Sequence, residues 1–132
     1  LLGVYTISKC TKDGENLTNS LGNESGYSIL SISNRDYNTY YSFYGINDNS
    51  RYSKELVYGD YDFDDRDILE FKQRNGYNYD STADYNKVLE AFVKEDVNAI
   101  IKKLTIKELI FEFEYNHKII RFECQKNMSD AE

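Results

Sequence analysis

Apolar and charged positions alternate most strictly near the end of the chain. Leu109 and Ile110 lead into residues 111–115, which alternate aromatic side chains with Glu, and residues 120–124 alternate apolar with charged side chains. A period of two residues is typical of a β-strand that buries one face. Since only a short polar turn at Asn116-His117 separates the two runs, we expect them to form an antiparallel hairpin.

The same two runs predict how the strands of this hairpin pair. One register places Phe111 opposite Phe122 on the apolar face, and it also brings Glu112 opposite Arg121 on the polar face. Apolar pairs and pairs of opposite charge both stabilise neighbouring strands when they face each other. A shift of one residue would reverse every inward side chain, so the agreement of both faces favours this register.

Polar turn residues divide most of the chain before this hairpin. Between the turns lie short runs rich in Tyr, Ile, Val, Phe and Thr, which are typical of strands. Asn75-Gly76 is the strongest turn signal, because both residues tolerate the positive φ angles of a two-residue hairpin turn. The predicted strands are 3–10, 27–33, 39–46, 52–58, 61–63, 68–74 and 77–80.

The spacing of apolar residues changes from two to 3.6 after Ser81, which predicts an amphipathic helix over 82–95. A longer helix that ends at Lys103 is the alternative, because the apolar stripe continues beyond an interruption by Asp. The fold class is therefore mainly β, an antiparallel barrel or half-barrel with one helix before a C-terminal hairpin. The predicted buried stripe of the helix comprises Tyr85, Val88, Leu89 and Phe92.

Length and charge narrow the classes of function. The chain has 132 residues and a mass of 15.5 kDa, which fits one β-rich domain over residues 1–132. Its net charge of −7 repels phosphate backbones, so we expect no nucleic-acid partner. We also expect no membrane span, because no apolar run approaches the roughly 18 residues required. The apolar start at residues 1–4 is shorter than a secretory signal.

Two features of the chain carry a resemblance to a known family. Gly3-Val4-Tyr5 opens the first strand, and residues 101–109 lead into the final hairpin. With the series of short strands between them, these features resemble the bacterial lipocalin-like proteins, which are small antiparallel β-barrels of the calycin type. The family's opening motif is Gly-x-Trp, and Tyr5 stands where the Trp belongs. The family also has an Arg near the last strand that packs on this Trp, and Arg121 is the candidate here.

Motifs that indicate catalysis are scarce. His117 is the one His of the chain and falls in the predicted hairpin turn, where such a side chain is usually solvated. The sequence contains no Gly-x-Ser-x-Gly elbow, no phosphate-binding loop and no HExxH pattern. We therefore expect a protein that is not an enzyme and needs no cofactor.

Asp residues alternate with aromatic residues from Asp60 to Asp64, like the first ligands of a calcium-binding loop. Asp65 stands where such a loop needs Gly, and Phe71 stands where it needs Glu. We therefore expect no metal site, and instead an exposed strand whose Asp side chains lie in water.

The two cysteines allow two interpretations. Cys10 ends the first predicted strand and Cys124 lies near the end of the last, and these strands are neighbours in an up-and-down barrel. A disulfide bond between them would close a long loop and stabilise the fold by about 4–5 kcal/mol. Two buried free thiols in a reducing compartment are equally compatible with the sequence.

Tyrosine carries most of the functional information, because the chain has 13 of them and each buried hydroxyl needs a hydrogen-bond partner or water. A Tyr-lined cavity meets this need and offers ring faces to an apolar ligand. We therefore expect a binding module for a small apolar or amphipathic molecule, secreted or associated with the cell envelope. The expected ligand-binding residues are Tyr27, Tyr41, Phe43, Tyr52, Phe111 and Phe113.

The alternative function is that of an acidic inhibitor or immunity-type protein that binds and blocks a basic partner protein. Tyr is enriched in the centres of protein interfaces, and an acidic surface attracts a basic one. The expected partner-binding residues are then Asp60, Asp62, Asp64 and Asp65.

Overall fold

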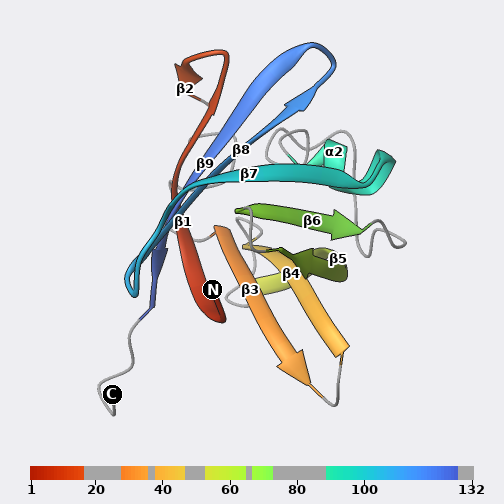
Figure 1. Cartoon of the computed structure of the whole chain (residues 1–132), viewed down its shortest axis with the longest axis vertical. Helices are drawn as coiled ribbons and strands as arrows, with labels where there is room; N and C mark the ends of the chain where they lie inside the picture. Colours follow the sequence, from red (N-terminus) through yellow and green to blue (C-terminus); the bar gives the residue numbers. More distant parts are fainter. Residues whose placement is uncertain (17–27, 36–37, 47–52, 65–66, 73–88, 128–132) are drawn as a thin grey trace.

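A computed structural model shows the chain as a strongly curved antiparallel β-sheet (Figure 1). The Asn75-Gly76 turn, the predicted strand 77–80 and positions 82–88 of the predicted helix lie outside the residues that it describes. The described residues are 1–16, 28–35, 38–46, 53–64, 67–72 and 89–127.

Most described residues lie in strands, and one short helix interrupts them. The helix is α2 (Glu90–Lys94), which lies beside the start of strand β7 in Figure 1. The strands are β1 (Gly3–Lys12), β2 (Glu15–Asn16), β3 (Ser28–Arg35), β4 (Asn38–Ile46), β5 (Ser53–Phe63), β6 (Ile68–Lys72), β7 (Val97–Leu104), β8 (Glu108–Tyr115) and β9 (Lys118–Lys126).

Eight of these strands close into a barrel. β1 pairs with β3, each strand from β3 to β8 pairs with the next one along the chain, and β9 pairs back with β1. The short β2 adds to the sheet beside the end of β1. The predicted fold class is therefore confirmed, and the barrel is closed rather than half-open.

Shifts in strand register help the sheet to curve. They occur at residues 7–9 between β1 and β9, at 43–44 between β4 and β5, and at 101–103 between β7 and β8. An extra residue in one strand bends that strand and increases its twist, which a sheet requires in order to close on itself.

The C-terminal hairpin pairs in the predicted register. Phe111 lies opposite Phe122, and Glu112 lies opposite Arg121. Both Phe side chains are fully buried, whereas Arg121 Nη1 donates to Glu112 Oε2 at 2.7 Å on the outer face. The sequence pattern on each face thus corresponds to a real cross-strand contact.

One predicted break between strands is wrong. Residues 52–58 and 61–63 were expected as separate strands, but β5 runs continuously through Gly59 to Phe63. A Cβ at Gly59 would collide with the Lys72 carbonyl oxygen and come within 3.0 Å of the Tyr41 ring. Gly59 is therefore required by the close approach of neighbouring strands, not by a turn.

Helix α2 ends where the shorter prediction placed it. Lys94 is its last residue, and the backbone is extended at Glu95. The alternative helix to Lys103 is wrong, because Val97–Leu104 is strand β7, in which the first five side chains alternate between buried and exposed.

Candidate functional site

Aromatic rings fill much of the barrel interior. Seven rings form this aromatic cluster, and each belongs to a side chain that is at most 4% exposed. Adjacent ring centroids lie 4.6 Å to 6.4 Å apart, within the range of favourable edge-to-face and offset contacts. The aromatic cluster comprises Tyr41 and Phe43 of β4, Phe71 of β6, Phe92 of α2, Phe111 and Phe113 of β8, and Phe122 of β9.

Phe92 lies at the centre of the aromatic cluster. Its ring centroid is 4.6 Å from that of Phe43 and 5.2 Å from those of Phe71 and Phe113. It also approaches the ring of Phe122 on β9 at 6.0 Å. The other six rings project from strands, so Phe92 is the one member that the helix supplies to a space walled by the sheet.

Helix α2 depends on this burial. It has five residues, and no side chain caps its N-terminus at Leu89. A helix this short has little stability of its own. Leu89 and Phe92 are buried, as the apolar stripe predicts, whereas Tyr85 and Val88 lie outside the described residues. Contacts of Leu89 and Phe92 with the interior therefore stabilise α2.

The structure brings four of the predicted ligand-binding residues together in the aromatic cluster: Tyr41, Phe43, Phe111 and Phe113. Tyr27 and Tyr52 lie outside the described residues. The aromatic cluster also contains Phe71, Phe92 and Phe122, which are not among the predicted ligand-binding residues. Strand alternation and helical spacing predict that each of them is buried, but these local patterns do not predict that they contact one another. Their contacts result from closure of the barrel.

Tyr41 provides a polar atom within the aromatic cluster. Its hydroxyl donates to the Lys72 carbonyl oxygen at 3.4 Å, which is longer than an ordinary O–H···O bond. Burial raises the pKa of Tyr41, and the carboxylates of Asp96 and Asp60 act in the same direction. The hydroxyl therefore remains a neutral donor at physiological pH.

Other tyrosines divide between the two faces of the barrel. Tyr5 and Tyr61 are buried, whereas Tyr40, Tyr44 and Tyr58 are partly exposed. The last three occupy strand positions that alternate with buried ones, so they lie on the outer face. Phe rather than Tyr consequently supplies most rings of the described interior, in contrast to the expected Tyr-lined cavity.

A cation packs on the aromatic residue of the first strand. Lys126 Nζ lies 5.7 Å from the centroid of the Tyr5 ring, and the Tyr5 hydroxyl donates to the Leu1 carbonyl at 2.8 Å. Burial raises the pKa of Tyr5 to about 12, with a smaller effect of Cys124. Arg121, the candidate from the family resemblance, instead faces outward and pairs with two Glu side chains.

Both cysteines are thiols that form no disulfide bond, and both are fully buried. They lie on the neighbouring strands β1 and β9, with Cys10 opposite Phe122 and Cys124 opposite Ile7. Burial raises the pKa of Cys10 to about 12 and also raises that of Cys124, where Cys10 adds to the effect. Thiols that keep their protons at neutral pH are poor nucleophiles.

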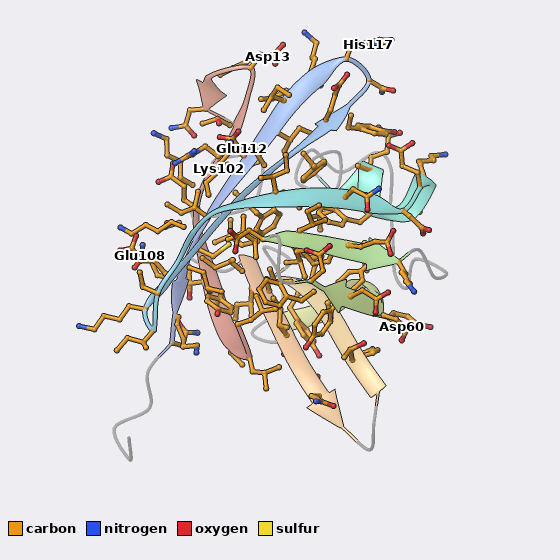
Figure 2. All side chains as sticks on the ribbon, in the orientation of Figure 1. Asp13, Asp60, Lys102, Glu108, Glu112 and His117 are labelled. Carbon is orange, nitrogen blue, oxygen red and sulfur yellow. The ribbon has the colours of Figure 1, made fainter. Side chains whose placement is uncertain are left out.

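The acidic residues considered for partner binding follow β5 and the turn after it. Asp62 and Asp64 are exposed and Asp60 is partly exposed, whereas Asp65 lies outside the described residues. Asp62 Oδ2 lies 2.7 Å from Lys72 Nζ, and this hydrogen bond raises the pKa of Lys72. Asp60 is on the right-hand side of the barrel in Figure 2.

A surface pocket of about 400 Å³ opens beside this acidic strand. Asp64 Oδ1 accepts a hydrogen bond from the Ile68 amide at 3.2 Å at its margin. In the part of the chain that the structure describes, no group of three or more His, Cys, Asp or Glu is arranged to hold a metal ion. The pocket is lined by Asp62, Asp64, Ile68, Glu70 and Asn98.

His117 lies exposed at the tip of the C-terminal hairpin, as predicted (Figure 2). Asn116 and His117 have φ angles of 52° and 63°, the left-handed pair that a two-residue hairpin turn requires. This position is at the surface, away from the aromatic cluster.

Neither the models of known protein families nor the sequences of curated proteins give a match to this chain. Within the described ranges, no helix is long and apolar enough to cross a membrane. Fold and interior define the class of protein: a small, closed antiparallel β-barrel with a buried aromatic cluster.

Proposed function

We propose that the protein is a non-catalytic binding module that takes a small apolar or amphipathic molecule into the barrel at the place of Phe92. An eight-stranded barrel is just wide enough to be filled by side chains or to hold one small ligand. The position of Phe92 carries the proposal, because a ring from a short helix occupies the centre of a space walled by rings from four strands.

Exchange of Phe92 for a ligand would preserve the contacts of the wall. The rings of Phe43, Phe71 and Phe113 lie about Phe92 at centroid distances of 4.6 Å to 5.2 Å. A ligand with a ring of similar size would make equivalent contacts. Since α2 has only five residues and no side-chain cap, its displacement would cost mainly the burial of Leu89, Ala91 and Phe92.

The polarity of the interior supports an uncharged or weakly polar ligand. Tyr5, Cys10, Tyr41 and Cys124 all have raised pKa values, so these groups are neutral at physiological pH. The long hydrogen bond from Tyr41 to the Lys72 carbonyl would allow the hydroxyl to turn toward an acceptor on an amphipathic ligand.

Two observations support a relation to the lipocalin-like barrels. Strands β3 to β9 pair in chain order and the last strand closes on the first. Lys126 lies over the ring of Tyr5, a cation on an aromatic ring that is similar to the Arg-on-Trp contact of that family.

Titration with the apolar fluorophore N-phenyl-1-naphthylamine tests the proposed site. Native protein should bind about one molecule, and Phe92→Ala should bind it more tightly because the competing side chain is removed. Tyr41→Ala with Phe43→Ala should weaken binding while the fold is retained. Phe63→Ala is the matched control, because Phe63 is 42% exposed and lies outside the aromatic cluster. A signal that tracks only the unfolded fraction would contradict the proposal.

The pocket beside β5 supports a second candidate function, the binding of a basic protein partner. Three of its lining residues are the carboxylates Asp62, Asp64 and Glu70. Binding of a Lys-rich peptide should weaken as salt is raised and when Asp62 and Glu70 become Asn and Gln. The control is Glu114→Gln, an exposed carboxylate on β8. Equal loss in the control would reject a specific site at the pocket.

A further inference from the structure

The turn between β7 and β8 concentrates basic and apolar side chains in an otherwise acidic protein. Residues 97–107 contain three Lys and neither Asp nor Glu, although the chain carries a net charge of −7. Lys102, Lys103 and Lys107 surround Leu104 and Ile106 in the sequence. We refer to residues 102–107 as the β7–β8 tip.

The apolar side chains of the β7–β8 tip are exposed to water. Ile106 is 74% exposed, the largest fraction among the exposed large apolar side chains of the described residues. Leu104 lies opposite the buried Leu109, yet it is 36% exposed. Hydrocarbon is thus presented at one end of the barrel, where its removal from water would be favourable.

Thr105 fixes the turn that presents Ile106. The Thr105 amide donates to the Glu108 carbonyl at 2.9 Å. Its hydroxyl oxygen accepts from the amides of Lys107 at 3.2 Å and of Glu108 at 3.0 Å. On the neighbouring strand, the Lys126 amide donates to the Lys107 carbonyl at 2.7 Å. These bonds hold the turn in one shape, so the exposure of Ile106 is built into the hairpin.

The lysines of the β7–β8 tip remain able to contact an external anion. Lys103 Nζ lies 3.1 Å from Glu108 Oε1, and Lys102 Nζ lies 3.9 Å from Glu112 Oε1. The two Lys side chains are 49% and 46% exposed, and such exposed ion pairs are weak. The acidic strand near Asp60 is on the opposite side of the barrel from Glu108 in Figure 2, and salt screens charges beyond about 8 Å at physiological ionic strength.

We propose that the β7–β8 tip is a contact site for an anionic lipid bilayer, with Ile106 and Leu104 inserted at the headgroup level and Lys102, Lys103 and Lys107 against the lipid phosphates. A lipid surface accepts a convex tip and offers both hydrocarbon and negative charge. A protein partner would need about 800 Å² of surface on each side, more than one narrow hairpin turn presents. Nucleic acid would attract the lysines but would leave Ile106 in water.

A single tryptophan reporter tests this contact directly, because the chain contains no Trp. The probe is a vesicle of phosphatidylcholine with about one-third phosphatidylglycerol, an anionic lipid surface. Emission from an Ile106→Trp variant should shift to shorter wavelength when these vesicles are added. The matched control is Ile119→Trp, because Ile119 is 45% exposed and follows the hairpin turn of His117 at the other end of the barrel (Figure 2).

Vesicle co-sedimentation tests the lysines. Replacement of Lys102, Lys103 and Lys107 by Gln should weaken binding to the anionic vesicles roughly tenfold or more, and Lys118→Gln should leave it within about twofold because that site is remote from the contact. Far-UV circular dichroism verifies that each variant is folded. Equal emission shifts at positions 106 and 119, unchanged binding of the triple variant, or a shift with duplex DNA but none with vesicles would each overturn the proposal.

Discussion

The aromatic cluster contains rings that are held in two different ways. Phe111 and Phe122 belong to the barrel wall, face each other across β8 and β9 at a centroid distance of 5.2 Å, and sit in strands that are paired on both sides. Phe92 comes from a five-residue helix without a side-chain cap. The comparison indicates that the paired strands determine the shape of the interior, whereas α2 supplies the ring that occupies its centre.

The wall should carry the larger share of stability. Phe111→Ala should lower the free energy of unfolding by about 3–5 kcal/mol, because a fully buried ring is removed from a paired strand. Urea denaturation measures this change. Phe63→Ala provides the control and should cost only about 1–2 kcal/mol, since its ring is already 42% exposed. Equal losses in both variants would show that burial in the barrel interior does not make Phe111 more important for stability than Phe63.

Loss of the Phe92 ring should lower the free energy of unfolding less than loss of Phe111, and a small aromatic ligand should restore part of that loss. Phe92→Ala is expected to lower the free energy of unfolding by about 3 kcal/mol, because α2 can move to fill part of the cavity. Toluene should raise the Tm of this variant more than that of the native protein, since binding to the folded state adds stability. Phe111→Ala serves for comparison, because toluene should restore it less completely. A larger rise in Tm for Phe111→Ala than for Phe92→Ala would indicate that the ring a ligand can replace belongs to a strand and not to α2.

High pH should lower the free energy of unfolding because it deprotonates the buried thiols of the barrel strands. The pKa of Cys10 is raised from 9.0 to about 12 in the folded protein. The contribution of this thiol to the free energy of unfolding is therefore fully present below pH 9. It falls as pH rises toward 12, because the thiol of the unfolded chain loses its proton first. The slope should approach about 1.4 kcal/mol per pH unit for each such group. Urea unfolding at pH 7 and near pH 10 measures the fall, which Cys10→Val should reduce. An unchanged slope in this variant would mean that other groups cause it.

The outer face of the wall should contribute least. Arg121 and Glu112 form an ion pair at 2.7 Å, but their side chains are 34% and 26% exposed. A double-mutant cycle with Arg121→Met and Glu112→Gln should give a coupling energy of about 0.2–1 kcal/mol that shrinks as salt is raised. A coupling as large as the loss from Phe111→Ala would show that the outer charges, not the inner rings, determine the register.

The sequence predicts the pairing of the barrel strands better than it predicts which side chain occupies the centre of the interior. The hairpin register follows from local alternation on two faces, since Phe111 with Phe122 and Glu112 with Arg121 require the same pairing. The end of α2 near Glu95 also follows from local pattern. That Phe92 enters the barrel does not follow, because an apolar stripe shows only that one helix face is buried and not against which strands.

Long-range closure explains the other differences. Gly59 is typical of a turn when read locally, but in the structure it allows the Tyr41 ring and the Lys72 carbonyl to approach β5. Likewise, Lys126 lies over Tyr5, and no local pattern in the sequence links the two. Both contacts depend on which strands become neighbours when the barrel closes, and this is not encoded in the spacing along any one strand.

Exchange of Phe92 for a ligand is tested most directly by amide hydrogen exchange in the presence of saturating N-phenyl-1-naphthylamine. The Glu95 amide, which donates to the Ala91 carbonyl at 3.0 Å, reports on α2, and the amide of Phe111 reports on the paired wall strand β8. We predict that the ligand speeds exchange at Glu95, because α2 leaves its place, and slows exchange at Phe111. Slower exchange at both positions, with α2 still docked, would contradict the exchange of Phe92 for the ligand.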